Sequence, residues 1–321
     1  MKRILIPSLV FLAAFLVGLL CAGHIFISVG QHSLFLLTPD YFSQMFREPF
    51  PVTRIAVSFV TQFFDIPAVG PAVAAALVTA VYVLAASALQ KHGTLGTVLS
   101  CLALACCVWL VVSPSVREKD RHCALEQFAR QHQWDKILKK ADFRTAEKDR
   151  FVIPYALLAL NAKGQLIEKM DMYPIKGPQD LDMEGVQTRE GYWFSSILDE
   201  CLGNYNEALH HLFQSGATLN QGMSHITLYQ LIRFNIENGN YTLARKYASV
   251  LRRNPRNAAL AKRILKSCEG KADREDTPEK AAAKVVTNAP AVNLALLRQA
   301  GIQSGMANER LAAYMKLTDI Q

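Results

Sequence analysis

A repeated turn centred on glycine is the feature that most constrains the fold of this chain. Leu202 to Ala208 has the sequence Leu-Gly-Asn-Tyr-Asn-Glu-Ala, and Asn238 to Ala244 has the sequence Asn-Gly-Asn-Tyr-Thr-Leu-Ala. In each copy the glycine supplies the left-handed backbone that ends a helix without a Cβ clash. The tyrosine and the small alanine that follow allow a second helix to pack closely on the first. The pattern predicts helix–turn–helix units.

Weaker copies of the same turn occur nearer the N-terminus. His132-x-Trp134 and Gly164-x-Leu166 align with Gly203-x-Tyr205 and Gly239-x-Tyr241, at intervals of 32, 39 and 36 residues. Such a period is typical of stacked helical repeats. The residues predicted to build these turns are Trp134, Gly164, Gly203, Tyr205, Ala208, Gly239, Tyr241 and Ala244.

The second part of the chain is predicted to be a helical-repeat domain over 115–268. Apolar residues at helical spacing predict helices at about 117–131, 134–140, 149–162, 166–170, 189–202, 206–215, 223–238, 241–253 and 257–268. Residues 269–290 are rich in Lys, Ala, Glu and Asp, which predicts a linker. Residues 291–321 return to a helical pattern and predict one further helix pair.

The first 114 residues differ in being almost without charge. They hold only five of the 35 Lys and Arg and three of the 27 Asp and Glu. Apolar runs at 4–29, 67–89 and 95–113 are long enough to cross a bilayer, which needs roughly 20 residues. We therefore expect a membrane domain with three spans over 1–114. Lys2 and Arg3 before the first run leave a cleaved signal peptide as an alternative, although the run exceeds the usual apolar core of about 7–15 residues.

Residues 31–66 separate the first two runs and are dense in aromatic side chains. Such side chains favour the bilayer interface, and Val52 to Phe64 has the pattern of an amphipathic helix. The segment is expected to be interfacial, with Gln62, Phe63 and Phe64 as candidate interfacial residues. It would either form a groove for a lipid or polymer or simply pack on the spans.

Charges near the predicted spans leave two orientations in the membrane open. Lys2 and Arg3 favour an N-terminus inside the cell, which puts the soluble part outside, whereas the larger number of bases around 117–130 favours a cytoplasmic soluble part. We expect an integral protein of the bacterial inner membrane, with the side of the soluble part left open.

The turns resemble the tetratricopeptide repeat, a helix–turn–helix unit of 34 residues. The positions that carry the resemblance are Gly203, Tyr205, Ala208, Gly239, Tyr241, Ala244, Ala248, Leu251 and Pro255. The family has a bulky aromatic residue where this chain has Leu212 and Ala248, so the array is degenerate. The resemblance implies an α-solenoid whose concave face binds a protein or peptide.

The whole layout resembles an uncharacterised group of bacterial membrane proteins. In that group a Gln-Phe-Phe-x-x-Pro element within the spans precedes a degenerate helical-repeat domain. Here the element is Gln62 to Pro67, and the Gln133-Trp134-Asp135 turn and the turn from Gly203 to Ala208 are the other matching places. The group has no established activity, so the resemblance implies no reaction.

Motifs for chemistry are weak throughout. Asp180, Asp182 and Glu184 alternate in a loop and could bind a hard cation, but a solvated acidic loop is the simpler interpretation. Adjacent His210 and His211 point to different helix faces, and His122-Cys123 lacks a partner base at a useful spacing. No phosphate-binding loop or nucleophile elbow is present in the sequence. We expect no catalytic residue, cofactor or metal.

The last clear repeat carries many bases. Arg245, Arg252, Arg253 and Lys262 are candidates for a basic binding face, which could meet anionic lipid headgroups or an acidic partner; an ordinary charged surface is the alternative. Charges of both signs are interleaved in the soluble part, so we expect no nucleic-acid partner.

Together these patterns predict an all-α chain with N-terminal transmembrane helices and a degenerate tetratricopeptide-like solenoid. The expected function is that of a membrane-anchored adaptor without catalytic activity, whose partners are membrane lipid and a protein or peptide. The alternative is a subunit of an envelope polymer-handling enzyme or transporter that uses the aromatic segment 31–66.

Overall fold

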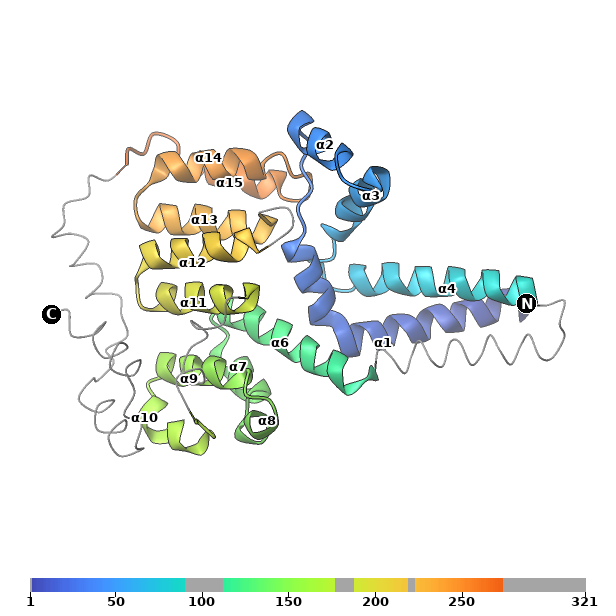
Figure 1. Cartoon of the computed structure of the whole chain (residues 1–321), viewed down its shortest axis with the longest axis horizontal. Helices are drawn as coiled ribbons and strands as arrows, with labels where there is room; N and C mark the ends of the chain where they lie inside the picture. The colour runs from blue at the N-terminus through green and yellow to red at the C-terminus, as the bar shows by residue number, and fades with distance from the viewer. Residues whose placement is uncertain (1, 90–111, 177–187, 219–222, 274–321) are drawn as a thin grey trace. The chain divides into compact units, whose positions relative to one another are not determined.

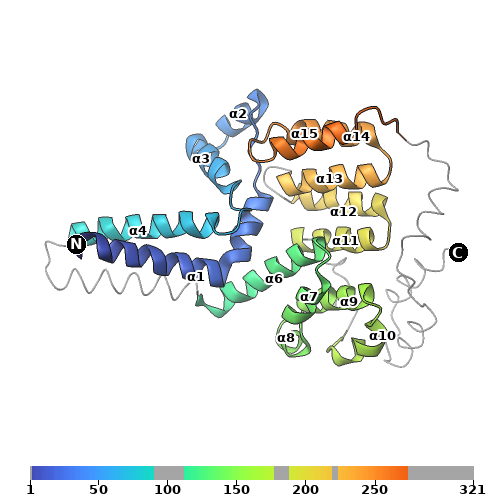
Figure 2. The same cartoon turned by 180° about the vertical axis from the view of Figure 1, so that it is seen from behind.

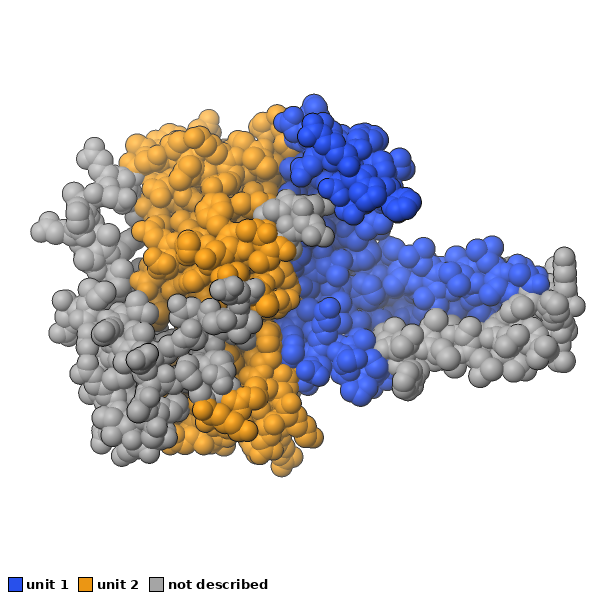
Figure 3. All heavy atoms as spheres, in the orientation of Figure 1, with its two compact units in different colours: residues 1–124 blue, residues 125–321 orange. Residues whose placement is uncertain are grey.

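The computed structural model describes residues 2–89, 112–176, 188–218 and 223–273. In these ranges every regular element is a helix, which confirms the all-helical prediction for the described residues. The chain forms two compact units, residues 1–124 and 125–321 (Figure 3). The third predicted span, the acidic loop, most of the linker and the C-terminal helix pair lie outside the described residues.

The described residues of the first unit form four helices and the start of a fifth. They are α1 (Lys2–His32), α2 (Pro39–Phe46), α3 (Pro51–Thr61), α4 (Val69–Leu89) and α6 (Pro114–Arg130), which continues into the second unit. Leu5–His32 of α1 and Val69–Ala88 of α4 are long and apolar enough to cross a membrane. The two helices lie side by side (Figures 1 and 2). Gly70 permits this approach, because a Cβ there would meet the Phe26 side chain at less than 3 Å.

Helix α1 is broken at Ala22, where φ is −139° and ψ is 17°. The break removes the intrahelical acceptors for the N–H groups of the next turn. One carboxylate oxygen of Asp120, in α6, accepts from the N–H of His24 at 2.8 Å and from that of Ile25 at 3.2 Å. The other oxygen lies 3.1 Å from His24 Nδ1. Asp120 therefore acts as the N-cap of the second half of α1, although it lies on another helix.

The second unit is built from short helices that follow one another closely. They are α7 (Trp134–Lys140), α8 (Phe143–Lys148), α9 (Val152–Ala162), α10 (Leu166–Lys169), the 3-10 helix η2 (Met170–Met172), α11 (Arg189–Cys201), α12 (Tyr205–Ala217), α13 (His225–Glu237), α14 (Tyr241–Leu251) and α15 (Ala258–Ser267). From α11 to α15 each helix packs on the next one in the chain, and both views show this order (Figures 1 and 2).

Four turns in this unit share one backbone geometry. The left-handed residues are His132 (φ +53°), Gly164 (φ +68°), Gly203 (φ +79°) and Gly239 (φ +80°). Each donates its N–H to the carbonyl three residues earlier at 2.9–3.1 Å, and the following residue donates to the carbonyl five residues earlier at 2.7–2.9 Å. This pair of bonds is the Schellman motif. His132 adopts it without being a glycine.

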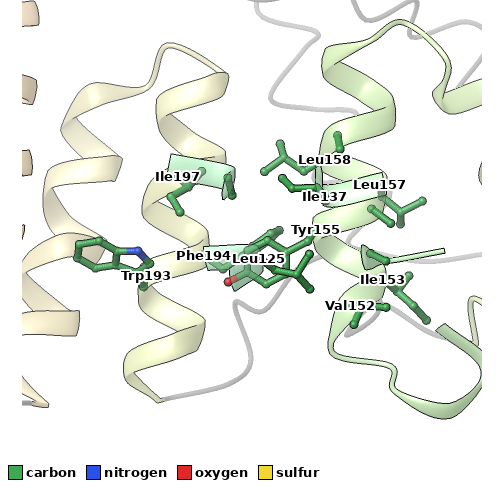
Figure 4. Close-up of a cluster of buried hydrophobic side chains, with 14 of the residues drawn as sticks. Leu125, Ile137, Val152, Ile153, Tyr155, Leu157, Leu158, Trp193, Phe194 and Ile197 are labelled. Atoms are coloured by element: carbon green, nitrogen blue, oxygen red, sulfur yellow. The ribbon is translucent and has the colours of Figure 1, made fainter. Parts of the chain in front are cut away.

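The core of the second unit lies among α6, α7, α9 and α11. Leu125, Ile137 and Ile153 are fully buried, and the Tyr155 and Phe194 rings meet edge to face at 4.9 Å between centroids. Figure 4 shows Leu125 and Tyr155 beside Phe194, whereas Trp193 lies on the other side of α11. Burial of this cluster supplies the main stabilising term for the unit, since each fully buried large apolar side chain contributes about 1.5–3 kcal/mol.

Replacement of Gly203 by alanine tests the turn geometry. Nothing lies within 4 Å of a Cβ placed there, so the cost is that of the left-handed backbone alone. We expect a loss of about 1–2 kcal/mol, or a fall of roughly 2–8 °C in the melting temperature of the full-length protein in detergent, followed by circular dichroism. Gly203→Asn, which tolerates this backbone better, should lose less. Equal losses for both variants would contradict the account.

Replacement of Asp120 tests the cap on α1. Asp120→Ala removes both acceptors, and we expect a loss of about 0.5–2 kcal/mol in thermal stability. Asp120→Asn keeps one oxygen acceptor for the N–H groups of His24 and Ile25 and should lose less than alanine. An alanine variant as stable as the original protein would show that the carboxylate does not cap the helix.

Candidate functional site

The residues predicted to build the repeat turns serve packing. Ala208 and Ala244 are fully buried where the paired helices cross. The ring centroids of Tyr205 and Phe234 are 6.0 Å apart, and this contact joins the pair α11–α12 to the pair α13–α14. Trp134 stacks on His132 at 5.1 Å. These positions contribute to packing between the helices.

Positive charge is concentrated at the last described helices. Residues 239–271, which contain α14 and α15, hold nine of the 35 Lys and Arg of the chain but only one of its 27 Asp and Glu, Glu269. This segment therefore accounts for the whole net charge of +8, and the other bases and acids balance. Such a segment attracts polyanionic surfaces or acidic peptides.

The four candidates for the basic face have different surroundings. Arg252, Arg253 and Lys262 are exposed. Arg245 is half-buried and its Nη1 donates to the carbonyls of Cys268 at 3.0 Å and Lys271 at 2.8 Å, so it holds α14 against the end of α15. On α15, Lys262, Arg263 and Lys266 occupy one exposed stripe. We name the exposed bases Arg252, Arg253, Lys262, Arg263 and Lys266 the basic face.

The candidate interfacial residues Gln62 and Phe64 are buried inside the first unit. The Phe64 ring meets Phe26 edge to face at 5.9 Å. A Cβ at Gly30 would lie less than 3 Å from the backbone of Phe64 and Asp65, so the chain after α3 packs directly on α1. Phe63 is half-buried. The Gln-Phe-Phe element therefore packs the chain after α3 against α1.

A cluster of charged side chains, which the sequence did not indicate, joins three helices of the second unit. Its members are Glu126, Arg130, His132, Arg189, Glu190, Glu200 and Arg233. Arg189 of α11 lies 2.8 Å from Glu190 and 3.7 Å from Glu126 of α6. Arg233 of α13 pairs with Glu200 of α11, whose carboxylate is also 3.5 Å from His132 Nε2. The three glutamates and three arginines of the cluster carry equal and opposite formal charges.

Burial dominates the electrostatics of this charged cluster. It raises the pKa of Glu126, against the opposite effect of Arg189 and Arg130. It also lowers the pKa of Arg130, and the nearby positive charge of Arg233 adds to this while Glu126 opposes it. The Arg130 guanidinium also lies over the Trp193 ring at 5.7 Å, a cation–π contact that partly replaces lost hydration.

The charged cluster therefore orients helices and offers no nucleophile. Buried ion pairs contribute less to stability than their Coulomb attraction suggests, because both ions lose hydration, but loss of one partner is costly. The neighbouring thiol of Cys201 has its pKa raised to about 12 by burial, so it stays protonated at neutral pH and is a poor nucleophile. His211 pairs with Asp199 at 3.4 Å, whereas His210 is exposed.

Glu200→Gln tests the charged cluster, because it removes the carboxylate that pairs with Arg233, while the nearby charge of Glu237 remains. We expect a loss of about 1–3 kcal/mol, below the 3–5 kcal/mol of a fully buried pair because Arg233 is partly exposed. The matched control is Asp135→Asn, which removes the pair between exposed Asp135 and Lys163 and should change stability by less than about 0.5 kcal/mol. Thermal melts of the full-length variants provide the measurement. Losses of equal size in both variants would exclude a special role for the buried pair.

No curated protein and no solved structure matches the chain. A family model does match, over residues 1–116 and 114–292, and it describes a family of unknown function (DUF6057). The two matches join near the start of α6 and together cover the first unit and most of the second. The chain belongs to this family of unknown function.

Proposed function

We propose that the protein is a membrane-anchored helical-repeat adaptor without catalytic activity of its own. The observation that carries the proposal is the Schellman turn that occurs four times, each copy followed two residues later by the start of a new helix. Helix pairs joined in this way stack into a tetratricopeptide-like solenoid, and such solenoids act by binding other proteins. Helices α1 and α4, together with the predicted span at 95–113, hold the solenoid at the bilayer.

The partner that this scaffold fits is an acidic protein segment. The basic face lies on the last described helices, and its bases are exposed. A surface with an excess of one charge sign accelerates association with a complementary partner and rejects like-charged ones. The charged cluster lies elsewhere in the unit and is internally balanced, so it serves to orient α6, α11 and α13.

Photo-crosslinking from the basic face tests the proposal. Benzoylphenylalanine is placed at Ala259, an exposed residue on the same stripe of α15, and full-length protein is irradiated in native membranes. We expect a discrete protein adduct whose yield falls roughly tenfold in Arg252→Glu/Lys262→Glu, which corresponds to about 1.4 kcal/mol of binding free energy. Lys139→Glu, at an exposed site on α7, should leave the yield unchanged.

Three results would contradict the adaptor. An adduct with lipid alone at Ala259 would assign the basic face to the headgroup surface. An equal loss of the adduct in Lys139→Glu would show that the contact depends on net charge and not on this face. Co-purification of a lipid-linked sugar that depends on exposed Arg54 would favour the polymer-handling alternative, and Arg54 suits this test better than buried Gln62.

A further inference from the structure

Helix α3 is apolar on the side that the protein does not cover. Its inner side presents Ile55 and Ser58. The outer side is formed by Val52, Ala56, Val57 and Val60, together with Thr53. Val52 is 72 % exposed and Val57 is 53 % exposed. An exposed apolar helix face is normally covered by a protein core, a partner or a membrane, and among the described residues of the first unit none covers this side.

The turn before α3 presents a large aromatic side chain at its tip. Phe50 lies between Pro49 and Pro51, has a left-handed backbone with φ of +56°, and is 80 % exposed. Left-handed backbone is unfavourable for a bulky residue and persists where the surrounding structure enforces it. Phe46, at the end of α2 and four residues before Phe50, is also exposed. The apolar outer side of α3 therefore continues onto the turn.

Aromatic side chains pack together at the base of the hairpin that α2 and α3 form. The Phe35 ring contacts those of Tyr41, Phe42 and Phe59 edge to face, with centroids 5.5, 6.1 and 5.2 Å apart. The C-terminal end of α3 leads to Phe64, which packs on α1. The exposed apolar side chains are therefore held on a preformed support.

Length and charge determine how such an element can meet a bilayer. Eleven residues of helix extend about 16 Å, which is too short for a hydrocarbon core of about 30 Å, so α3 cannot span it. Exposed Arg47 and Arg54 flank the tip. Arg54 is held there by the Pro49 carbonyl at 3.1 Å and by Glu48 at 3.7 Å. Guanidinium groups beside an apolar surface suit the level of lipid phosphates.

We propose that α2 and α3 form a wedge embedded in one leaflet of the bilayer. Phe50, Val52, Val57 and Val60 would lie among the acyl chains, with Arg47 and Arg54 at the phosphates. Lipid is the occupant that fits, because the hairpin joins the end of α1 to the start of α4, the two helices that are long and apolar enough to cross the same membrane. The inference rests on the membrane anchoring included in the proposed function.

Lipid photo-crosslinking tests the wedge. Benzoylphenylalanine replaces Val57 in the full-length protein, which is reconstituted into vesicles of phosphatidylethanolamine and phosphatidylglycerol, irradiated and analysed by mass spectrometry. Val81 of α4, 66 % exposed, is the positive control, and Phe213 of α12, 42 % exposed, is the control outside the first unit. We expect phospholipid adducts at Val57 with a yield similar to that at Val81 and at least about tenfold above that at Phe213.

The results of this experiment distinguish failure of the wedge from failure of the membrane anchoring by α1 and α4 on which the wedge rests. Adducts at Val81 without adducts at Val57 would overturn the wedge and leave the anchor standing. Adducts between Val57 and a second copy of the chain, or another protein, in place of lipid would also overturn the wedge, because α3 would then be a protein interface. No lipid adduct at Val81 would overturn the anchor and the wedge together.

Discussion

Two hydrogen bonds at a left-handed residue determine how the second unit is built. At the end of a helix the last carbonyls have no intrahelical donor, and the Schellman pair satisfies two of them while it reverses the chain. Because the next helix begins two residues later at Trp134, Leu166, Tyr205 and Tyr241, little chain is left to vary the angle between partners. Fully buried Ala208 and Ala244 then allow close contact. Local backbone geometry thus brings successive helices into contact from α11 to α15.

Charge burial places a second constraint on this unit. The charged cluster ties α6 to α11 and α11 to α13, and its members depend on one another because each guanidinium or carboxylate would be expensive to bury alone. Arg130 of this cluster lies over the Trp193 ring, and Figure 4 shows Trp193 on the other side of α11 from Tyr155 and Phe194. Helix α11 is thus held both by apolar packing and by ion pairs to α6 and α13. The exposed positive charge that is left over lies at α14 and α15, where it is available to a partner.

Much of the helical pattern could be predicted from the sequence, because turns and apolar spacing are local signals. Helix α7 has the predicted bounds 134–140, and α11 to α15 differ by at most two residues at each end from the predicted helices. Helices α2 and α8 were missed because eight and six residues carry little periodicity. The break in α1 could not be predicted either, because Ala22 lies within a continuous apolar run. The residue that caps the helix after the break, Asp120, lies about a hundred residues away in sequence.

The candidate sites were harder to predict, because they depend on contacts distant in sequence. Glu126 and Arg130 lie on a helix rich in charged residues, a pattern that usually indicates solvent, and only the fold buries them. Gln62 has the sequence context of an interfacial residue but is fully buried, because Gly30 lets the segment approach α1. His132 is aligned with three glycines, and that alignment was the only sign of its left-handed backbone.

Hydrogen–deuterium exchange of the full-length Gly203→Ala variant in lipid nanodiscs tests the central claim, that the second unit is a stack of helices held by its turns. In a stack each element depends mainly on its neighbours. We therefore predict faster exchange in α11, α12 and α13 than in the original protein, with α1 and α4 unchanged. Equally faster exchange throughout the chain, or faster exchange confined to the turn itself with α13 unaffected, would contradict the account.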